Sequence, residues 1–298
     1  MKKYFHIPVS LAILIAATCC NSTIQEQQVV HYVSNNTDQV ATISIPGYHD
    51  SIRIMQITDS HIDIPNEQEA DLAAYGERMH TAYMNPRRHY SRDISKSTVE
   101  FFDDLLLKAK EESVELLLLT GDIVNFPSAV SVQHVYDRLK ETGIPWLYTS
   151  GNHDWHYEGM EGTPDLLRSV WEDKVLKPLY NDLDPLYYSQ VIRGINFVNI
   201  DNSTGEITEE QKVFLQDQMS KPEPVILLSH IPYSLGRGVN GVSIAGFTDI
   251  LLSNDDKIVA IITGHIHRTS FFTTGNMCQY TSMAGFQGAS FLFDIRPR

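Results

Sequence analysis

Short, almost wholly apolar runs recur along the chain from about residue 43 onward, with helix-like patterns between them. The five clearest runs are Ile52–Thr58, Leu116–Thr120, Pro145–Thr149, Val225–Ser229 and Ile258–Thr263. Continuous apolar runs of this length are typical of strands that are buried on both faces, as in α/β proteins. We therefore expect residues 42–298 to form one domain that combines buried sheet and helices.

Helix signals lie between these runs. Two capping boxes mark helix starts, at Ser97–Glu100 and at Thr208–Gln211. A third helix is expected from Val130 to about Thr142, ended by Gly143, and a fourth begins around Pro164. Alternation of apolar strands with helices predicts an α/β fold.

The first residues have the layout of an export signal, which we assign to residues 1–20. A short positive region precedes an apolar stretch from Ile7 to Thr18, which is far shorter than the roughly 20 residues that span a bilayer. Cys19 and Cys20 end this stretch and resemble the acylated cysteine of a bacterial lipoprotein signal, although neither follows the usual leucine. The alternative is an exported protein with two incidental cysteines and no lipid anchor.

Behind this signal, residues 21–41 are polar and rich in Gln and Asn, so we expect them to form a tether. The sequence thus predicts an exported protein that is periplasmic or at the cell surface. The expected membrane attachment is an acyl group on Cys19 or Cys20.

The charge balance limits the partners of the chain. It has 298 residues, with Lys+Arg 23 against Asp+Glu 37, and a net charge of −14. General electrostatic attraction to a nucleic acid duplex or to anionic lipid is therefore excluded, and an anionic substrate requires a local positive centre. Its three cysteines cannot form a disulfide framework, and Cys278 is expected to be a small buried residue.

Each of the five apolar runs ends in residues that can bind a metal ion. These residues are Asp59, His61, Asp122, Asn152, His153, Asp154, His230, His265 and His267. Taken singly, such an Asp is usually a turn residue and such a His a hydrogen-bonded core or surface residue. Ligands of open α/β sheets gather at the carboxyl ends of strands, however, so the joint pattern predicts a metal site there.

In chain order the blocks read Asp-x-His, Gly-Asp, Gly-Asn-His-Asp, a strand-end His, and Gly-His-x-His. This order resembles the signature of the calcineurin-like metallophosphoesterase superfamily, from about Ile52 to Arg268, and is most similar to its cyclic-nucleotide phosphodiesterase-like bacterial branch. Asn125 stands where purple acid phosphatases place a tyrosine ligand, which disfavours that branch. The resemblance implies a four-layer α/β/β/α sandwich of two mixed sheets flanked by helices.

The resemblance also implies two divalent metal ions and a bridging hydroxide at the strand ends. One ion would take Asp59, His61 and His267; the other would take Asn152, His230 and His265; Asp122 would bridge both. Imidazole and carboxylate ligands accept manganese, iron or zinc, so the identity of the metals stays open. The absence of cysteine from this set excludes a thiolate-rich structural zinc site.

His153 is the one histidine of the third block that is left without a metal. By resemblance it is the general acid that protonates the leaving oxygen, and Asp154 orients it. The alternative is that His153 only stabilises its loop.

Substrate choice is expected to depend on segments outside the matched blocks. Residues 62–95 form a long insertion that brings Tyr83, Arg87, Arg88, His89 and Tyr90 close together in sequence. They form either a lid, in which arginine binds phosphate and tyrosine stacks on a base, or an ordinary surface loop.

Two further segments are expected to lie beside the site or at a sheet edge. The glycine-rich loop from Pro232 to Gly246, with Arg237, is expected to flank the second metal. The stretch Thr269–Phe293 alternates as one or two hairpins and is expected to cover a sheet edge.

The sequence therefore predicts a metal-dependent hydrolase of phosphoester bonds. Its substrate would be a small phosphorylated compound, a phosphodiester or phosphomonoester, with nucleotides among the candidates. A lipid-phosphate or pyrophosphate hydrolase at the membrane surface and a non-catalytic surface lipoprotein are the alternatives. The oligomeric state is not predicted.

Overall fold

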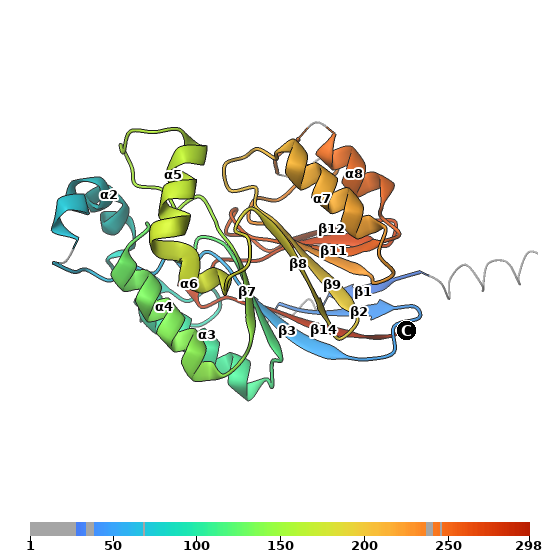
Figure 1. Cartoon of the computed structure of the whole chain (residues 1–298). Coiled ribbons are helices and arrows are strands. Elements are labelled where there is room, and N and C mark those ends of the chain that lie inside the picture. Colours follow the sequence, from blue (N-terminus) through green and yellow to red (C-terminus); the bar gives the residue numbers. More distant parts are fainter. Residues whose placement is uncertain (1–27, 34–38, 68, 237–240, 245) are drawn as a thin grey trace, which may run out of the picture.

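The computed structural model describes residues 28–33, 39–67, 69–236, 241–244 and 246–298, and within them two six-stranded mixed sheets face each other (Figure 1). The first sheet has the order β1 (Val30–Val33), β2 (Val40–Ile45), β14 (Phe291–Pro297), β3 (Ile52–Ile57), β6 (Leu116–Thr120) and β7 (Trp146–Thr149). The second has the order β12 (Ser270–Thr274), β13 (Met277–Thr281), β11 (Ile258–Thr263), β10 (Val225–Leu228), β9 (Ile195–Ile200) and β8 (Tyr187–Ile192).

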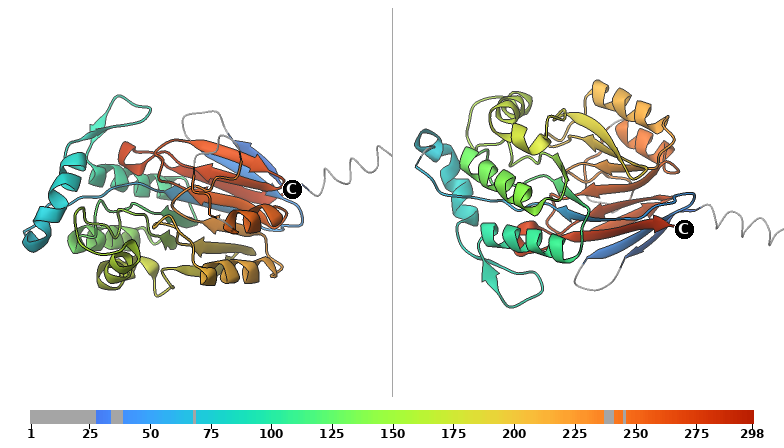
Figure 2. Two further views of the ribbon diagram at one scale, coloured as in Figure 1. Left: turned by 90° about the horizontal axis from the view of Figure 1, so that it is seen from above. Right: turned by 60° about the horizontal axis from the view of Figure 1, so that its bottom comes forward.

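Helices cover the outer faces of both sheets, which completes the predicted four-layer sandwich (Figures 1 and 2). The first sheet is covered by α3 (Thr98–Glu111) and α4 (Ala129–Thr142), and the second by α7 (Glu209–Met219) and α8 (Phe247–Ser253). The remaining elements are η1 (Ala70–Leu72), α2 (Ala73–Tyr83), β4 (Arg87–Arg88), β5 (Ser95–Lys96), α5 (Pro164–Trp171), η2 (Glu172–Leu176), α6 (Lys177–Tyr180) and η3 (Gly285–Gln287).

Alternation along the strands divides the apolar side chains between two cores. In β10, Ile226 and Leu228 belong to the core that lies between the sheets, whereas Val225 and Leu227 belong to the core under α7 and α8. Successive side chains of a strand point to opposite faces, so a strand covered on both sides must be apolar throughout. This explains why the central strands appear in the sequence as continuous apolar runs.

The local signals for the helices are confirmed. Capping boxes form at Ser97 and at Thr208, and Pro164 occupies the first turn of α5. Gly143 ends α4 with a left-handed backbone (φ 71°), a conformation that costs glycine no steric penalty.

Two expectations about the ends of the domain need correction. Residues 30–33 and 40–41 lie in β1 and β2, so the segment expected to be a tether contributes one strand and the start of a second to the first sheet. β1 alternates between exposed and partly buried positions, and β2 between partly buried and buried positions. The hairpin β12–β13 does end in an edge strand, but β14 pairs with both β2 and β3 inside the first sheet.

The N-terminal end of β1 lies far from the carboxyl ends of the central strands. Val29 lines a cavity with residues that precede β9, β10 and β11, such as Gly194, Pro224 and Lys257. Cys19 and Cys20 lie outside the described residues, whereas Cys278 is fully buried, as expected. None of the helices in the described residues has the length and apolar character needed to cross a bilayer.

A buried glutamine joins the two sheets beneath the strand ends. Gln56 of β3 donates from Nε2 to Thr120 Oγ1 of β6 (2.7 Å) and to the carbonyl of Thr263 of β11 (2.7 Å). The carboxyl ends of β3 and β6 are thereby held next to that of β11, although they belong to different sheets.

A buried cluster of Arg168, Glu172 and Asp201, beside the carboxyl end of β9, predicts how stability depends on pH. The pKa of Glu172 is raised to about 8, mainly by burial and then by the negative charge of Asp201. Arg168 opposes this increase, and Asp184 adds to it. The unfolded chain releases this proton near its ordinary pKa of 4.5. The stabilising effect of protonation is therefore complete below the unfolded pKa and is lost as the pH rises through about 8.

We expect Glu172→Gln to remove this pH dependence, because a neutral amide keeps the size of the side chain without the buried charge. Its free energy of unfolding should exceed that of the wild type by about 1–3 kcal/mol at pH 8, and the difference should shrink toward pH 5. Urea unfolding at both pH values measures the effect. A difference that is constant with pH would contradict it.

Candidate metal centre

The five strand-end blocks meet at one edge of the sandwich. Five of their residues have a left-handed backbone although they are not glycine, namely Asp59 (φ 51°), His61 (φ 44°), Asp122 (φ 52°), His265 (φ 70°) and His267 (φ 53°). This conformation is costly for residues with a side chain and is concentrated at functional sites. The sharp bends turn these side chains back over the edge of the sheets.

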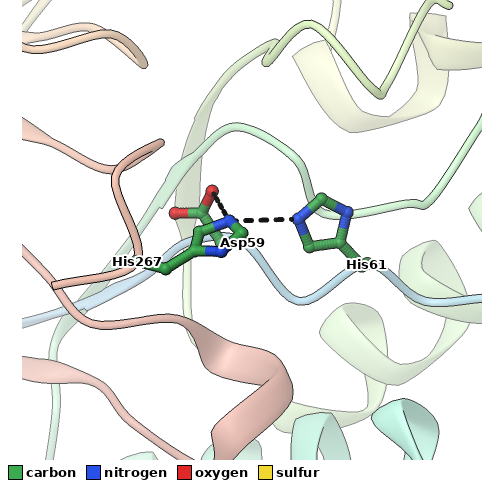
Figure 3. A group of neighbouring side chains, drawn as sticks. All are labelled: Asp59, His61 and His267. Carbon is green, nitrogen blue, oxygen red and sulfur yellow. Dashed lines mark hydrogen bonds and ion pairs between the residues drawn. The ribbon is translucent and has the colours of Figure 1, made fainter. Parts of the chain in front are cut away.

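Asp59, His61 and His267 form the first group of candidate ligands, and their side chains point toward one another (Figure 3). His267 Nε2 lies 3.2 Å from Asp59 Oδ1 and 3.4 Å from His61 Nε2. Asp59 and His61 follow β3 of the first sheet, whereas His267 follows β11 of the second. The group therefore spans the two sheets.

Asp122, His230 and His265 form a second group. His230 Nε2 lies 3.2 Å from Asp122 Oδ2 and 3.3 Å from His265 Nδ1. Asp122 also forms a group with His61 and His153, and its Oδ2 atom lies 3.8 Å from His61 Nε2. Asp122 Oδ2 thus lies between His230 of the second group and His61 of the first.

The donors present fit divalent cations. Asn152 Oδ1 is buried and has no hydrogen-bond partner among the described residues, so its carbonyl oxygen is available to a cation. Imidazole nitrogens face each other at 3.3 and 3.4 Å in the two groups, an arrangement that a cation between them would satisfy. Imidazole, carboxylate and amide oxygen together suit manganese, iron or zinc.

Burial and charge set the protonation of the histidines. Burial lowers the pKa of His61 to about 3, so its ring is neutral at pH 7 and can donate a lone pair to a cation. Burial also opposes the charged form of His230, but Asp122 and Asp59 together raise its pKa to about 10. A cation at this position would replace the proton of His230, because metal ligation requires neutral imidazole.

Residues outside the five blocks hold the ligands in place. The His230 ring donates from Nδ1 to the carbonyl of Thr120 (2.8 Å), which turns Nε2 toward Asp122. Asn202 accepts the backbone N–H groups of His230 (3.2 Å) and Ile231 (2.9 Å) through Oδ1. At Gly151 a Cβ atom would overlap the Asp122 carboxylate, so this close approach requires glycine. Asn202 was not recognised in the sequence, because an Asn after a strand is ordinary turn chemistry.

The structure corrects the role expected for Asp154. Its carboxylate is fully buried and accepts the backbone N–H groups of Val124 (2.9 Å) and Gly151 (2.8 Å). His153 instead donates from Nδ1 to the carbonyl oxygen of Asn125 (3.0 Å). Adjacent side chains point in different directions here, so Asp154 braces the loop while Asn125 orients the ring of His153.

Two aromatic rings cover one side of the site. Tyr83, at the end of α2, stacks on His61 with ring centres 4.3 Å apart and an interplanar angle of 10°. Phe286 lies 5.1 Å from His267 and 5.7 Å from His61 between ring centres. Phe286 was not recognised, because its position depends on backbone bonds from Gly285 to Thr58 and from Phe286 to Asp59.

The 62–95 insertion is thus divided between the site and the surface. Tyr83 and Arg87 lie beside the candidate ligands, whereas Arg88 is exposed and His89 stacks on Tyr90 away from them. The loop expected to flank the second metal is described only in part, and Arg237 lies outside the described residues.

Comparisons with known proteins agree with this geometry. The family model described as calcineurin-like phosphoesterase matches residues 52–269. A probable cyclic nucleotide phosphodiesterase of Psychrobacter is 24% identical over 80% of this chain and 77% of its own length. The 3′,5′-cyclic adenosine monophosphate phosphodiesterase of Escherichia coli is 21% identical over 73% of this chain and 70% of its own length.

Among solved structures, a dimetal phosphatase from Danio rerio shares the fold, with a TM-score of 0.53 and 14% identity over 79% of this chain and 88% of its own. The family model covers all the candidate metal ligands, from Asp59 to His267. The chain belongs to the calcineurin-like phosphoesterase family and is a metal-dependent hydrolase of phosphoric esters.

Proposed function

We propose that this protein is an exported phosphodiesterase that hydrolyses small diesters of the nucleotide type at a centre of two divalent metal ions. The position of Asp122 is the main support, because its carboxylate groups with His230 and His265 of one proposed ligand set and, separately, with His153 and with His61 of the other set. A carboxylate shared in this way is what a pair of ions about 3.5–4 Å apart requires.

The proposed ligands are those assigned from the sequence. One ion would be held by Asp59, His61 and His267, the other by Asn152, His230 and His265, with Asp122 between them. When bound, such a pair supplies Lewis acidity and a nucleophile that is available at neutral pH. Because the chain carries a net charge of −14, it also supplies the local positive charge that an anionic substrate needs.

His153 is the proposed proton donor to the leaving oxygen. The bond from its Nδ1 atom to the Asn125 carbonyl leaves Nε2 as the nitrogen that can act on the substrate. His153 lies close enough to His61 and Asp122 to group with them, so a proton on Nε2 would lie beside the reacting phosphoryl group.

Diester preference is supported by the relatives, two of which are named as phosphodiesterases of cyclic nucleotides. Export is supported by the positive start and short apolar stretch of residues 1–20, and lipid attachment by Cys19 and Cys20. Lipid-phosphate hydrolysis is the alternative activity, and the experiment below distinguishes it from diester hydrolysis.

The test is an activity panel on the purified protein after chelation and after reloading with Mn²⁺. We expect hydrolysis of bis-(4-nitrophenyl) phosphate and of a 3′,5′-cyclic nucleotide to exceed that of 4-nitrophenyl phosphate, and chelation to abolish all three. Higher activity on detergent-dispersed lipid phosphates would favour the membrane-surface alternative. Folded, metal-loaded protein that leaves every ester intact would contradict the proposal.

A further inference from the structure

The 62–95 insertion is fastened directly to the loops of the candidate metal centre. Asn125 donates from Nδ2 to the carbonyl of Met79 in α2 (2.8 Å) and to Asp63 Oδ2 (3.0 Å). The same Asp63 oxygen pairs with His80 Nδ1 at 2.9 Å. Since Asn125 also orients His153, the position of α2 is tied to the proposed proton donor. The end of this helix is therefore fixed relative to the site.

Tyr83, the last residue of α2, and Arg87 of β4 lie side by side at this fixed end of the insertion. The guanidinium carbon of Arg87 lies 5.0 Å from the ring centre of Tyr83 and 5.7 Å from that of Phe286. Tyr83 in turn stacks on His61, and Phe286 contacts His267. Arg87 therefore contacts two rings that themselves contact His61 and His267, two of the proposed ligands of one metal ion. The Tyr83 ring thus contacts both the imidazole of His61 and the guanidinium of Arg87.

The charge of Arg87 lacks the acidic partner that other arginines of the insertion have. Arg78 pairs with Glu158, and Arg88 pairs with Asp93 at 3.3 Å. No ion pair of Arg87 occurs in the part of the chain that the structure describes, and its buried Nε atom has no hydrogen-bond partner there. The guanidinium thus lies against two rings that contact the proposed ligands, and no acidic side chain of the described residues neutralises its charge.

We propose that Arg87 binds an oxygen of the phosphoryl group of the substrate, and this rests on the proposed function. A guanidinium offers planar, charge-assisted hydrogen bonds that match phosphate oxygens. Packing against Tyr83 and Phe286 excludes water and preorganises the side chain, which strengthens such bonds. The insertion thereby supplies a substrate-binding cation from this chain itself, next to the proposed metal pair.

The test is phosphate binding to the Mn²⁺-loaded full chain, measured by calorimetry with inorganic phosphate as the probe. Arg87→Met keeps an unbranched apolar side chain but removes the charge and the donors. We expect it to weaken phosphate binding about 10- to 100-fold and to raise KM for bis-(4-nitrophenyl) phosphate. Arg87→Lys should restore part of the affinity, because it returns the charge without the planar fork. Metal content and melting temperature should match the wild type.

Arg88→Met is the matched control, since it removes the same charge from the next residue of β4, whose side chain is 77% exposed. Phosphate affinities within about twofold of each other for Arg87→Met and Arg88→Met would overturn the proposal. It would also be overturned if Arg87→Met weakened only the binding of a cyclic nucleotide, since Arg87 would then contact the nucleoside. Because phosphate binding is read without turnover, an inactive wild type would count against the proposed function alone.

Discussion

Replacing Asp122 with alanine is expected to lower turnover of bis-(4-nitrophenyl) phosphate by at least about 10³-fold, because the proposed metal pair loses its shared ligand. Metal content, measured by elemental analysis, should fall from about two equivalents to one or none. The carboxylate also accepts the backbone N–H of His153 (2.8 Å), so the alanine variant loosens the loop that carries the proposed acid.

Asp122→Asn separates these two effects. The amide oxygen can still accept the N–H of His153, so the loop should stay in place, but a neutral amide is a poor bridge between two cations. We expect this variant to lose metal and activity while the loop that carries His153 keeps its position. Wild-type metal content and turnover in both variants would disprove the shared-ligand role.

The second large effect is expected at His153 and depends on the leaving group. His153→Ala should slow hydrolysis of a 3′,5′-cyclic nucleotide by about 10²- to 10⁴-fold, because an alkoxide needs a proton to leave. Nitrophenolate leaves without protonation, so the loss on bis-(4-nitrophenyl) phosphate should stay below about tenfold. The measurement is kcat on both substrates at saturating metal.

His156→Ala is the control for this experiment, because His156 is also part of the loop but its ring packs beside Trp155. It should leave the ratio of the two rates unchanged. Equal losses on both substrates in His153→Ala would mean that His153 only supports the loop and does not donate the proton.

The strand-end residues could be found from the sequence because each depends on short-range order. An apolar run predicts a buried strand, and the residue after it must lie at the carboxyl edge, whatever the rest of the chain does. Asp59 after β3 and His230 after β10 are examples. The helix starts at Ser97 and Thr208 are local in the same sense, because both partners of each capping box lie within one turn.

Residues that reach the site through tertiary packing could not be found in this way. Phe286 lies beside His61 only because η3 hydrogen-bonds to the backbone after β3, more than 200 residues earlier in the chain. Arg87 contacts the rings beside the site whereas Arg88 is exposed, because neighbouring residues of a strand face opposite ways. Which of the two faces the site depends on how β4 packs against the rest of the domain. Asp154 was misassigned for a related reason, because adjacency in sequence says little about where a side chain points.

The placement of Val29 at the amino ends of the strands has a geometric consequence for the proposed membrane attachment. A six-residue strand is about 20 Å long, so the N-terminal approach and the ligand edge are separated by the height of the sheets. If the chain is held at a bilayer by an acylated N-terminal cysteine, as proposed, the attached segment joins the folded domain at the end of the sheets opposite the ligand edge.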